Sequence, residues 1–296
     1  MDATDTGRAR NGEIELYYET FGEPTRGTLV LVNGLGSQLI SFPPEFCRLF
    51  VDRGFRVVRF DNRDVGLSTK TPGRPPSIPS IIGAARQDRE GMVPYTLSDM
   101  ASDVVAVLDA VAASDAHLWG MSMGGMIVQT VASEYPDRVA SLTSVMSSTG
   151  DPKVGGATPE AMKVLTTPPP TDRDGAIAHG IHSREVISGS HYDPATSRAM
   201  GEAAHDRCFH PLGTGFQMAA ITAPGNRTAA LAKVVAPTMV IHGRLDPLIN
   251  VSGGAATAEA IAGAELVVLD TMGHDIPEPL WATYVELFER LVGGGG

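Results

Sequence analysis

Residues 120–124 have the sequence Gly-Met-Ser-Met-Gly, so a serine stands between two glycines where two apolar runs meet. A serine hydroxyl can act as a nucleophile when a sharp strand-to-helix turn holds it above the end of a sheet. Such a turn needs strained backbone angles and a close approach of helix to strand, which small flanking residues permit. The pattern predicts that Ser122 is a nucleophile. The alternative is a serine that merely begins the helix.

A serine needs a base to take its proton, and a histidine held by a carboxylate can serve. His274 follows an apolar run that predicts a strand, and Asp246 follows another. These side chains and Ser122 therefore fall beyond the carboxyl ends of strands, where an open parallel sheet forms its crevice. We predict a catalytic triad of Ser122, Asp246 and His274. Asp151, which follows a further predicted strand, is the alternative acid.

Two backbone N–H groups are expected to form an oxyanion hole. Acyl transfer places negative charge on the substrate carbonyl oxygen, and each donor stabilises it by roughly 3 kcal/mol. Met123 directly follows the nucleophile, and Leu35 lies in the sequence Asn-Gly-Leu-Gly-Ser-Gln at 33–38. The two glycines of this loop let the backbone approach the oxygen closely. We therefore predict Leu35 and Met123 as the donors, with a plain tight turn as the alternative for the loop.

Strand-like and helix-like stretches alternate through the first half of the chain and return near its end. This order predicts a mostly parallel sheet flanked by helices, joined by right-handed crossovers. We expect strands at 13–21, 28–32, 55–60, 116–120, 139–148, 238–243 and 265–270. We expect helices at 44–54, 97–111, 123–135, 253–263 and 280–292.

The alternation stops between residues 149 and 235. This stretch contains Thr-Thr-Pro-Pro-Pro, scattered histidines and several modest helical segments, but no clear buried strand. We interpret 149–235 as a helical cap, or lid, inserted into an α/β core. Residues 1–148 and 236–296 are then the two parts of that core.

Composition limits the partners. The chain of 296 residues has a formal net charge of −11, which disfavours nucleic acid and anionic membranes as partners. No apolar run approaches the ~20 residues of a membrane span, and the polar start of the chain lacks the apolar core of a secretion signal. The two cysteines match no metal-ligand spacing. We expect a cytoplasmic monomer or homodimer that acts on a small molecule without metal or cofactor.

These motifs resemble those of the α/β-hydrolase superfamily, and the resemblance covers nearly the whole chain. The matching segments are 33–36, 61–68, 120–125, 242–247 and 271–275. Within the superfamily the chain is similar to actinobacterial carboxylesterases and lipases. It is also similar to the aclacinomycin methylesterase group, whose members hydrolyse a methyl ester on a polyketide antibiotic. The resemblance implies the α/β-hydrolase fold, a serine hydrolase activity, and a helical cap between the sixth and seventh core strands.

Two positions depart from the family pattern. The oxyanion loop commonly begins with His-Gly and here begins with Asn33, whose side chain we expect to hydrogen-bond and hold the loop. The loop after the fourth core strand usually carries Arg-Gly, and here Asp64 follows Arg63.

The predicted function is hydrolysis of a small or medium apolar carboxylic ester through an acyl-enzyme. Relatives that open epoxides or displace halide use an aspartate nucleophile, and the ether that Ser122 would form in those reactions is not readily cleaved by water. Lactone cleavage, carbon–carbon bond hydrolysis and perhydrolysis remain alternatives on the same triad. A non-catalytic binding protein is a further alternative.

Overall fold

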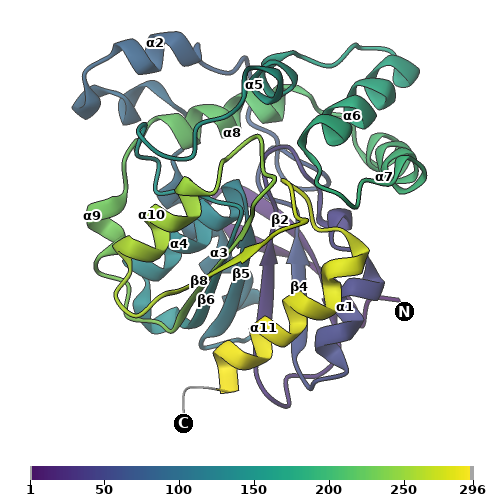
Figure 1. The fold of residues 1–296 in the computed structure, drawn as a ribbon, viewed down its shortest axis with the longest axis vertical. Coiled ribbons are helices and arrows are strands. Elements are labelled where there is room, and N and C mark those ends of the chain that lie inside the picture. Colours follow the sequence, from purple (N-terminus) through teal and green to yellow (C-terminus); the bar gives the residue numbers. More distant parts are fainter. Residues whose placement is uncertain (1, 294–296) are drawn as a thin grey trace.

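The computed structural model describes residues 2–293; residue 1 and residues 294–296, the end of the expected core, lie outside the described part. An eight-stranded sheet runs through the centre of the molecule in the order β1-β2-β4-β3-β5-β6-β7-β8 (Figure 1). The strands are β1 (Asp5–Asn11), β2 (Ile14–Phe21), β3 (Thr28–Val32), β4 (Arg56–Phe60), β5 (Ala116–Met121), β6 (Val139–Val145), β7 (Thr238–Gly243) and β8 (Glu265–Leu269). The pairs β1–β2 and β2–β4 are antiparallel, and all other neighbours are parallel.

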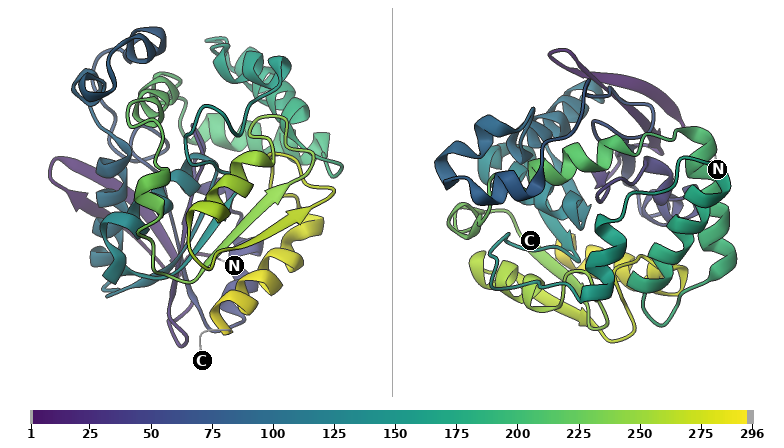
Figure 2. Two further views of the ribbon diagram at one scale, coloured as in Figure 1. Left: turned by 60° about the vertical axis from the view of Figure 1, so that its left-hand side comes forward. Right: turned by 90° about the horizontal axis from the view of Figure 1, so that it is seen from above.

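Helices cover both faces of the sheet. One face carries α1 (Pro44–Val51) and α11 (Trp281–Gly293), while the other carries α3 (Leu97–Ala110), α4 (Met123–Glu134) and α10 (Ser252–Ala260) (Figures 1 and 2). Each layer of helices forms its own apolar core with the sheet. The expected mostly parallel sheet between helices is therefore confirmed.

The central strand β3 shows why the sheet is buried on both sides. Val30 and Val32 point into the core shared with α3 and α4. Leu29 and Leu31 point into the opposite core, shared with α1 and α11. All four side chains are fully buried. A continuous apolar run is typical of a parallel strand covered on both faces, because successive side chains point to opposite sides of the sheet.

The structure contains one strand, β1, that the sequence analysis did not predict. β1 (Asp5–Asn11) is polar and half exposed, and it pairs with β2 at the edge of the sheet. The turn between the two strands is Gly12-Glu13, and the glycine has a φ of 58°. A glycine at the first position of a two-residue turn is a hairpin signal, so a local clue to β1 was present.

The insertion, residues 149–235, connects β6 to β7 and contains only helices and loops. Its helices are α5 (Pro159–Thr166), α6 (Arg173–Ile187), α7 (Pro194–Arg207), α8 (Leu212–Thr222) and α9 (Thr228–Leu231). A further helix, α2 (Ile78–Gly83), lies between β4 and α3, where the sequence predicts no element, and contacts α8 (Figure 1). Ser77 caps α2 by accepting the Ser80 N–H, which explains why so short a helix begins there.

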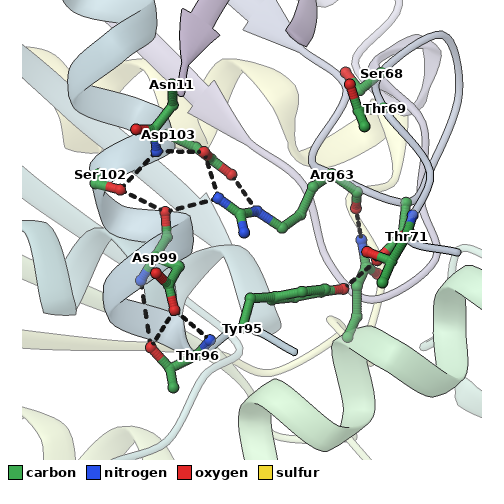
Figure 3. Close-up of polar contacts among 12 residues, drawn as sticks. Asn11, Arg63, Ser68, Thr69, Thr71, Tyr95, Thr96, Asp99, Ser102 and Asp103 are labelled. Carbon is green, nitrogen blue, oxygen red and sulfur yellow. Dashed lines mark hydrogen bonds and ion pairs between the residues drawn. The ribbon is translucent and has the colours of Figure 1, made fainter. Parts of the chain in front are cut away.

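A buried ion pair orders the loop after β4, at the second departure from the family pattern (Figure 3). The Arg63 guanidinium donates to both carboxylate oxygens of Asp103 on α3, at 2.6 and 2.7 Å. The Tyr95 ring lies 4.8 Å from this guanidinium and donates its hydroxyl to Asp64 at 2.6 Å. Asp64 has a φ of 72° and also accepts two hydrogen bonds from Thr71. An aspartate therefore replaces the usual glycine here because its side chain closes the loop.

Within residues 2–293, no helix combines the length and the apolar character that crossing a lipid bilayer requires.

We predict that Asp103→Ala lowers the free energy of unfolding by about 3 kcal/mol, because it leaves the buried Arg63 guanidinium without a carboxylate partner, with only the Asp99 carbonyl to bind. Asp109→Ala serves as the control, since Asp109 lies on the same helix and pairs with Arg138 at the surface. The control should lose less than about 1 kcal/mol. Urea unfolding measures both losses, and equal losses would contradict a structural role for the buried pair.

Candidate active site

Ser122 lies in a strained turn between β5 and α4. Its φ is 55° and its ψ is −119°, a conformation that costs a residue with a side chain about 1–3 kcal/mol. Hydrogen bonds hold the turn from both sides. The Ser122 N–H donates to the Val145 carbonyl at 2.9 Å, and the Ser122 carbonyl accepts from Ser147 Oγ at 2.8 Å and from the Met126 N–H at 3.2 Å. The end of β6 therefore fixes the serine.

The glycines around Ser122 are needed for close packing. A Cβ atom on Gly120 would overlap the Gly124 carbonyl, and one on Gly124 would overlap the Val32 carbonyl at the end of β3. A Cβ atom on Gly125 would lie 2.5 Å from Ser147 Cβ. None of these three glycines has a positive φ, so the small size of each residue is what the site requires.

The three predicted triad residues meet at the carboxyl ends of their strands. His274 Nε2 lies 2.9 Å from Ser122 Oγ, and His274 Nδ1 lies 2.7 Å from Asp246 Oδ2. The other carboxylate oxygen of Asp246 accepts the N–H groups of Leu248 and Ile249 at 2.9 and 2.8 Å. If Nδ1 donates to the carboxylate, Nε2 has a free lone pair toward the hydroxyl. The arrangement can move a proton from Ser122 to the imidazole.

The alternative acid, Asp151, is not part of this arrangement. Its carboxylate accepts the Lys153 N–H at 3.0 Å, and no hydrogen bond joins it to His274 in the part of the chain that the structure describes. The loop after β6 instead reaches the site through Ser147, which bonds the carbonyl of Ser122.

A second histidine, His242, holds the loop that carries Asp246. His242, at the end of β7, is fully buried, and its Nε2 donates to the Ile249 carbonyl at 2.7 Å. Burial lowers the pKa of His242, which favours a neutral ring. The ring therefore holds the loop that carries Asp246, consistent with the structural role that its place in the strand suggests.

The loop after β3 passes beside the serine. A Cβ atom on Gly34 would lie 3.3 Å from Ser122 Cβ. Within residues 2–293, the N–H groups of Leu35 and Met123 donate to no protein acceptor. The Gly36 N–H is occupied, because it donates to Gln217 Oε1 at 2.8 Å. Both N–H groups are therefore free to bind another acceptor.

The expected hydrogen bond of the Asn33 side chain is not found. The side chain is fully buried, and among the described residues its amide atoms have no partner. Its backbone carbonyl accepts from Asn62 Nδ2 at 3.1 Å instead. The loop is held further along by Gln217 on α8, which also donates to the Arg63 carbonyl at 2.8 Å. Nothing in the sequence around Gln217 predicts this role, because its partners come from distant loops.

No group of three or more His, Cys, Asp or Glu side chains within residues 2–293 is arranged to hold a metal ion.

A family model described as alpha/beta hydrolase fold matches residues 27–192, more than half of the chain. The chain belongs to the α/β-hydrolase family. Among curated relatives, rhodomycin D methylesterase DnrP of Streptomyces peucetius is 27% identical over 301 residues, covering 92% of this chain and 94% of that protein. The 3-oxoadipate enol-lactonase 2 of Acinetobacter baylyi is 26% identical over 276 residues, covering 87% of this chain and 86% of that protein.

Solved structures give the same fold. An enol-lactonase from Burkholderia xenovorans LB400 is 22% identical with a TM-score of 0.71, covering 97% of this chain and all (100%) of the other. A hydrolase from Pseudomonas aeruginosa PA01 is 25% identical with a TM-score of 0.67, covering 100% of both chains. Ester hydrolysis is the activity that family membership and these relatives support.

We predict that Gly124→Ala lowers the free energy of unfolding by about 3 kcal/mol, because its Cβ would push α4 away from the backbone of β3. Gly83→Ala is the control, since a Cβ there meets no atom within 4 Å. The control should change stability by less than about 0.5 kcal/mol. Urea unfolding of both variants tests this, and a Gly124→Ala protein as stable as the control would argue against the close approach.

Proposed function

We propose that the protein hydrolyses carboxylic esters through an acyl-enzyme formed on Ser122. The observation that carries this proposal is the pair of contacts of His274, 2.9 Å to Ser122 Oγ and 2.7 Å to Asp246 Oδ2. In the first step Ser122 Oγ attacks the ester carbonyl carbon while His274 Nε2 takes the hydroxyl proton. The carbonyl oxygen becomes negatively charged and is bound by the N–H groups of Leu35 and Met123.

The remaining steps return the enzyme to its starting state. The imidazolium of His274 gives its proton to the leaving alcohol as the carbon–oxygen bond breaks, and the acyl group stays on Ser122. Water then attacks the acyl carbon, and His274 takes a proton from that water. The proton passes to Ser122 Oγ as the carboxylic acid leaves. These steps need no cofactor or metal ion.

Asp246 is proposed to keep the ring of His274 in the required tautomer and to stabilise its positive charge. Its side chain is fully buried, and two backbone N–H groups orient the oxygen that does not face the imidazole. This fixed geometry means that little reorganisation is needed when the imidazolium forms.

We also propose that residues 149–235 act as a cap that lines the substrate pocket. Gln217 of α8, bonded to Gly36, supports this role because it connects the insertion to the oxyanion loop. The substrate would be a small or medium apolar ester, and the relatives named methylesterase and enol-lactonase support an ester or its cyclic form. The protein is proposed to act in the cytoplasm, as a monomer or homodimer.

Lactone hydrolysis is the second candidate, favoured by the enol-lactonase relative. A lactone is a cyclic ester, so the same steps apply, except that the alcohol formed in the first step stays attached to the acyl group. Comparing kcat/KM on p-nitrophenyl esters, methyl esters and lactones would separate the two. A lactone preferred over every open-chain ester would favour the second candidate.

We predict that Ser122→Ala lowers the turnover of p-nitrophenyl butyrate by at least about 10³-fold, because the attacking oxygen is removed. Wild-type protein should turn over this ester. Ser114→Ala is the control, since this exposed serine donates only to the neighbouring Asp115. The control should match the wild type. Retained turnover in a folded Ser122→Ala protein would refute the nucleophile.

We predict that Asp246→Asn lowers kcat by about 10³ to 10⁴-fold, because an amide cannot hold the imidazole in the same tautomer. Asp151→Asn should leave kcat unchanged, since among residues 2–293 the Asp151 carboxylate hydrogen-bonds only to the Lys153 N–H. Steady-state kinetics on p-nitrophenyl butyrate compares the two variants. The reverse result would assign the acid to Asp151.

A further inference from the structure

The insertion makes direct backbone contact with the loop that carries the proposed base. We call residues 187–191, which begin at the last residue of α6, the linker, and residues 271–275 the histidine loop. The His274 N–H donates to the Ile187 carbonyl at 2.7 Å, and the Ser190 N–H donates to a carbonyl of the histidine loop at 2.9 Å. The main chain of His274 is therefore bound to the insertion, while its ring faces Ser122.

One carboxylate joins the two segments. Asp275 Oδ1 accepts the Gly273 N–H at 3.2 Å and the Gly189 N–H at 3.3 Å. The side chain is largely buried, and burial raises the pKa of Asp275, while the hydrogen bonds from Gly189, Gly273 and the Ser188 side chain oppose that rise. Oδ1 of Asp275 is thus bonded to both segments, and among residues 2–293 the carboxylate makes no hydrogen bond to Ser122 or Asp246.

Two glycines let the segments touch. A Cβ atom on Gly189 would overlap the Thr271 carbonyl and the Gly273 nitrogen, and one on Gly273 would overlap the Gly189 nitrogen. Neither glycine has a positive φ. The absence of a side chain, rather than backbone freedom, is therefore what this contact requires. The contact leaves little room for the linker to move relative to the histidine loop, because the two backbones are closely packed.

We propose that Asp275 is a positioning residue that bonds the histidine loop to the linker and so sets the place of the His274 imidazole relative to Ser122. This inference rests on the proposed function. Asp246 orients the ring through Nδ1, but the backbone of His274 needs a separate anchor. The Ile187 carbonyl of the linker binds the His274 N–H. Asp275 in turn binds the Gly189 N–H and so fixes the linker against the histidine loop. The insertion then takes part in aligning the base.

Replacing Asp275 tests the proposal with a matched pair of variants. Asp275→Ala removes the acceptor, and a shift of the imidazole by about 1 Å should lower kcat by about 10²-fold with KM little changed. Asp275→Asn keeps a carbonyl oxygen that can accept both N–H groups, so it should recover most of the lost kcat. Asp275→Asn as slow as Asp275→Ala would overturn the proposal, because the charge rather than the junction would then matter.

A second pair of variants alters the junction without touching Asp275. Gly189→Ala places a methyl group between the linker and the histidine loop, and kcat should fall while KM is retained. Gly180→Ala is the matched control on α6, because a Cβ there has only Arg184 Nη1 within 4 Å, at 3.9 Å. The control should keep the wild-type kcat. Gly189→Ala with wild-type kcat would also overturn the proposal.

The wild type and all four variants are assayed together on p-nitrophenyl butyrate, and thermal unfolding confirms that each protein is folded at the assay temperature. Turnover by the wild type with unchanged kcat in Asp275→Ala would overturn the positioning role alone. No turnover by the wild type on any activated ester would overturn the proposed function, and the positioning role with it.

Discussion

The left-handed backbone of Ser122 is the constraint on which the rest of the site depends. A residue with a side chain adopts a φ of 55° only when its surroundings hold it there. Here β5 and α4 are both buried in packed layers, and the end of β6 bonds the turn through Val145 and Ser147. The strain is thus offset by the burial of the sheet and by the glycines that allow α4 to approach it. The direction of the Ser122 hydroxyl is therefore set by β5, α4 and the end of β6.

The partners of the serine are held by a different kind of interaction. His274 and Asp246 lie on loops, so hydrogen bonds rather than the packing of strands hold their side chains in place. Asp246 accepts two backbone N–H groups, and His242 holds the same loop through its bond to the Ile249 carbonyl. The same strategy orders the loop after β4, where the buried Arg63 guanidinium binds Asp103. Buried hydrogen bonds of this kind favour one loop conformation because leaving any of their groups unpaired is costly.

The sequence predicts those features that depend on short-range pattern. Apolar runs placed the strands, and the strand ends placed Ser122, Asp246 and His274 on one edge of the sheet. Other contacts between distant segments leave no such signal in the sequence. Gln217 meets the oxyanion loop across 181 residues, and Gly189 meets Asp275 across 86. The expectation for Asn33 was wrong for the same reason, since the direction of a buried side chain depends on packing that no local pattern records.

The glycine contact between the linker and the histidine loop limits how this architecture can change. The proposed cap between β6 and β7 is a natural place for substrate preference to diverge, because connecting segments tolerate more change than the strands they join. In this chain, however, any replacement must still present a residue without a side chain opposite Gly273, and a carbonyl opposite the backbone of His274. On the roles proposed above, a chimera that grafts a foreign segment between β6 and β7 would lose the alignment of His274, unless those few residues were kept.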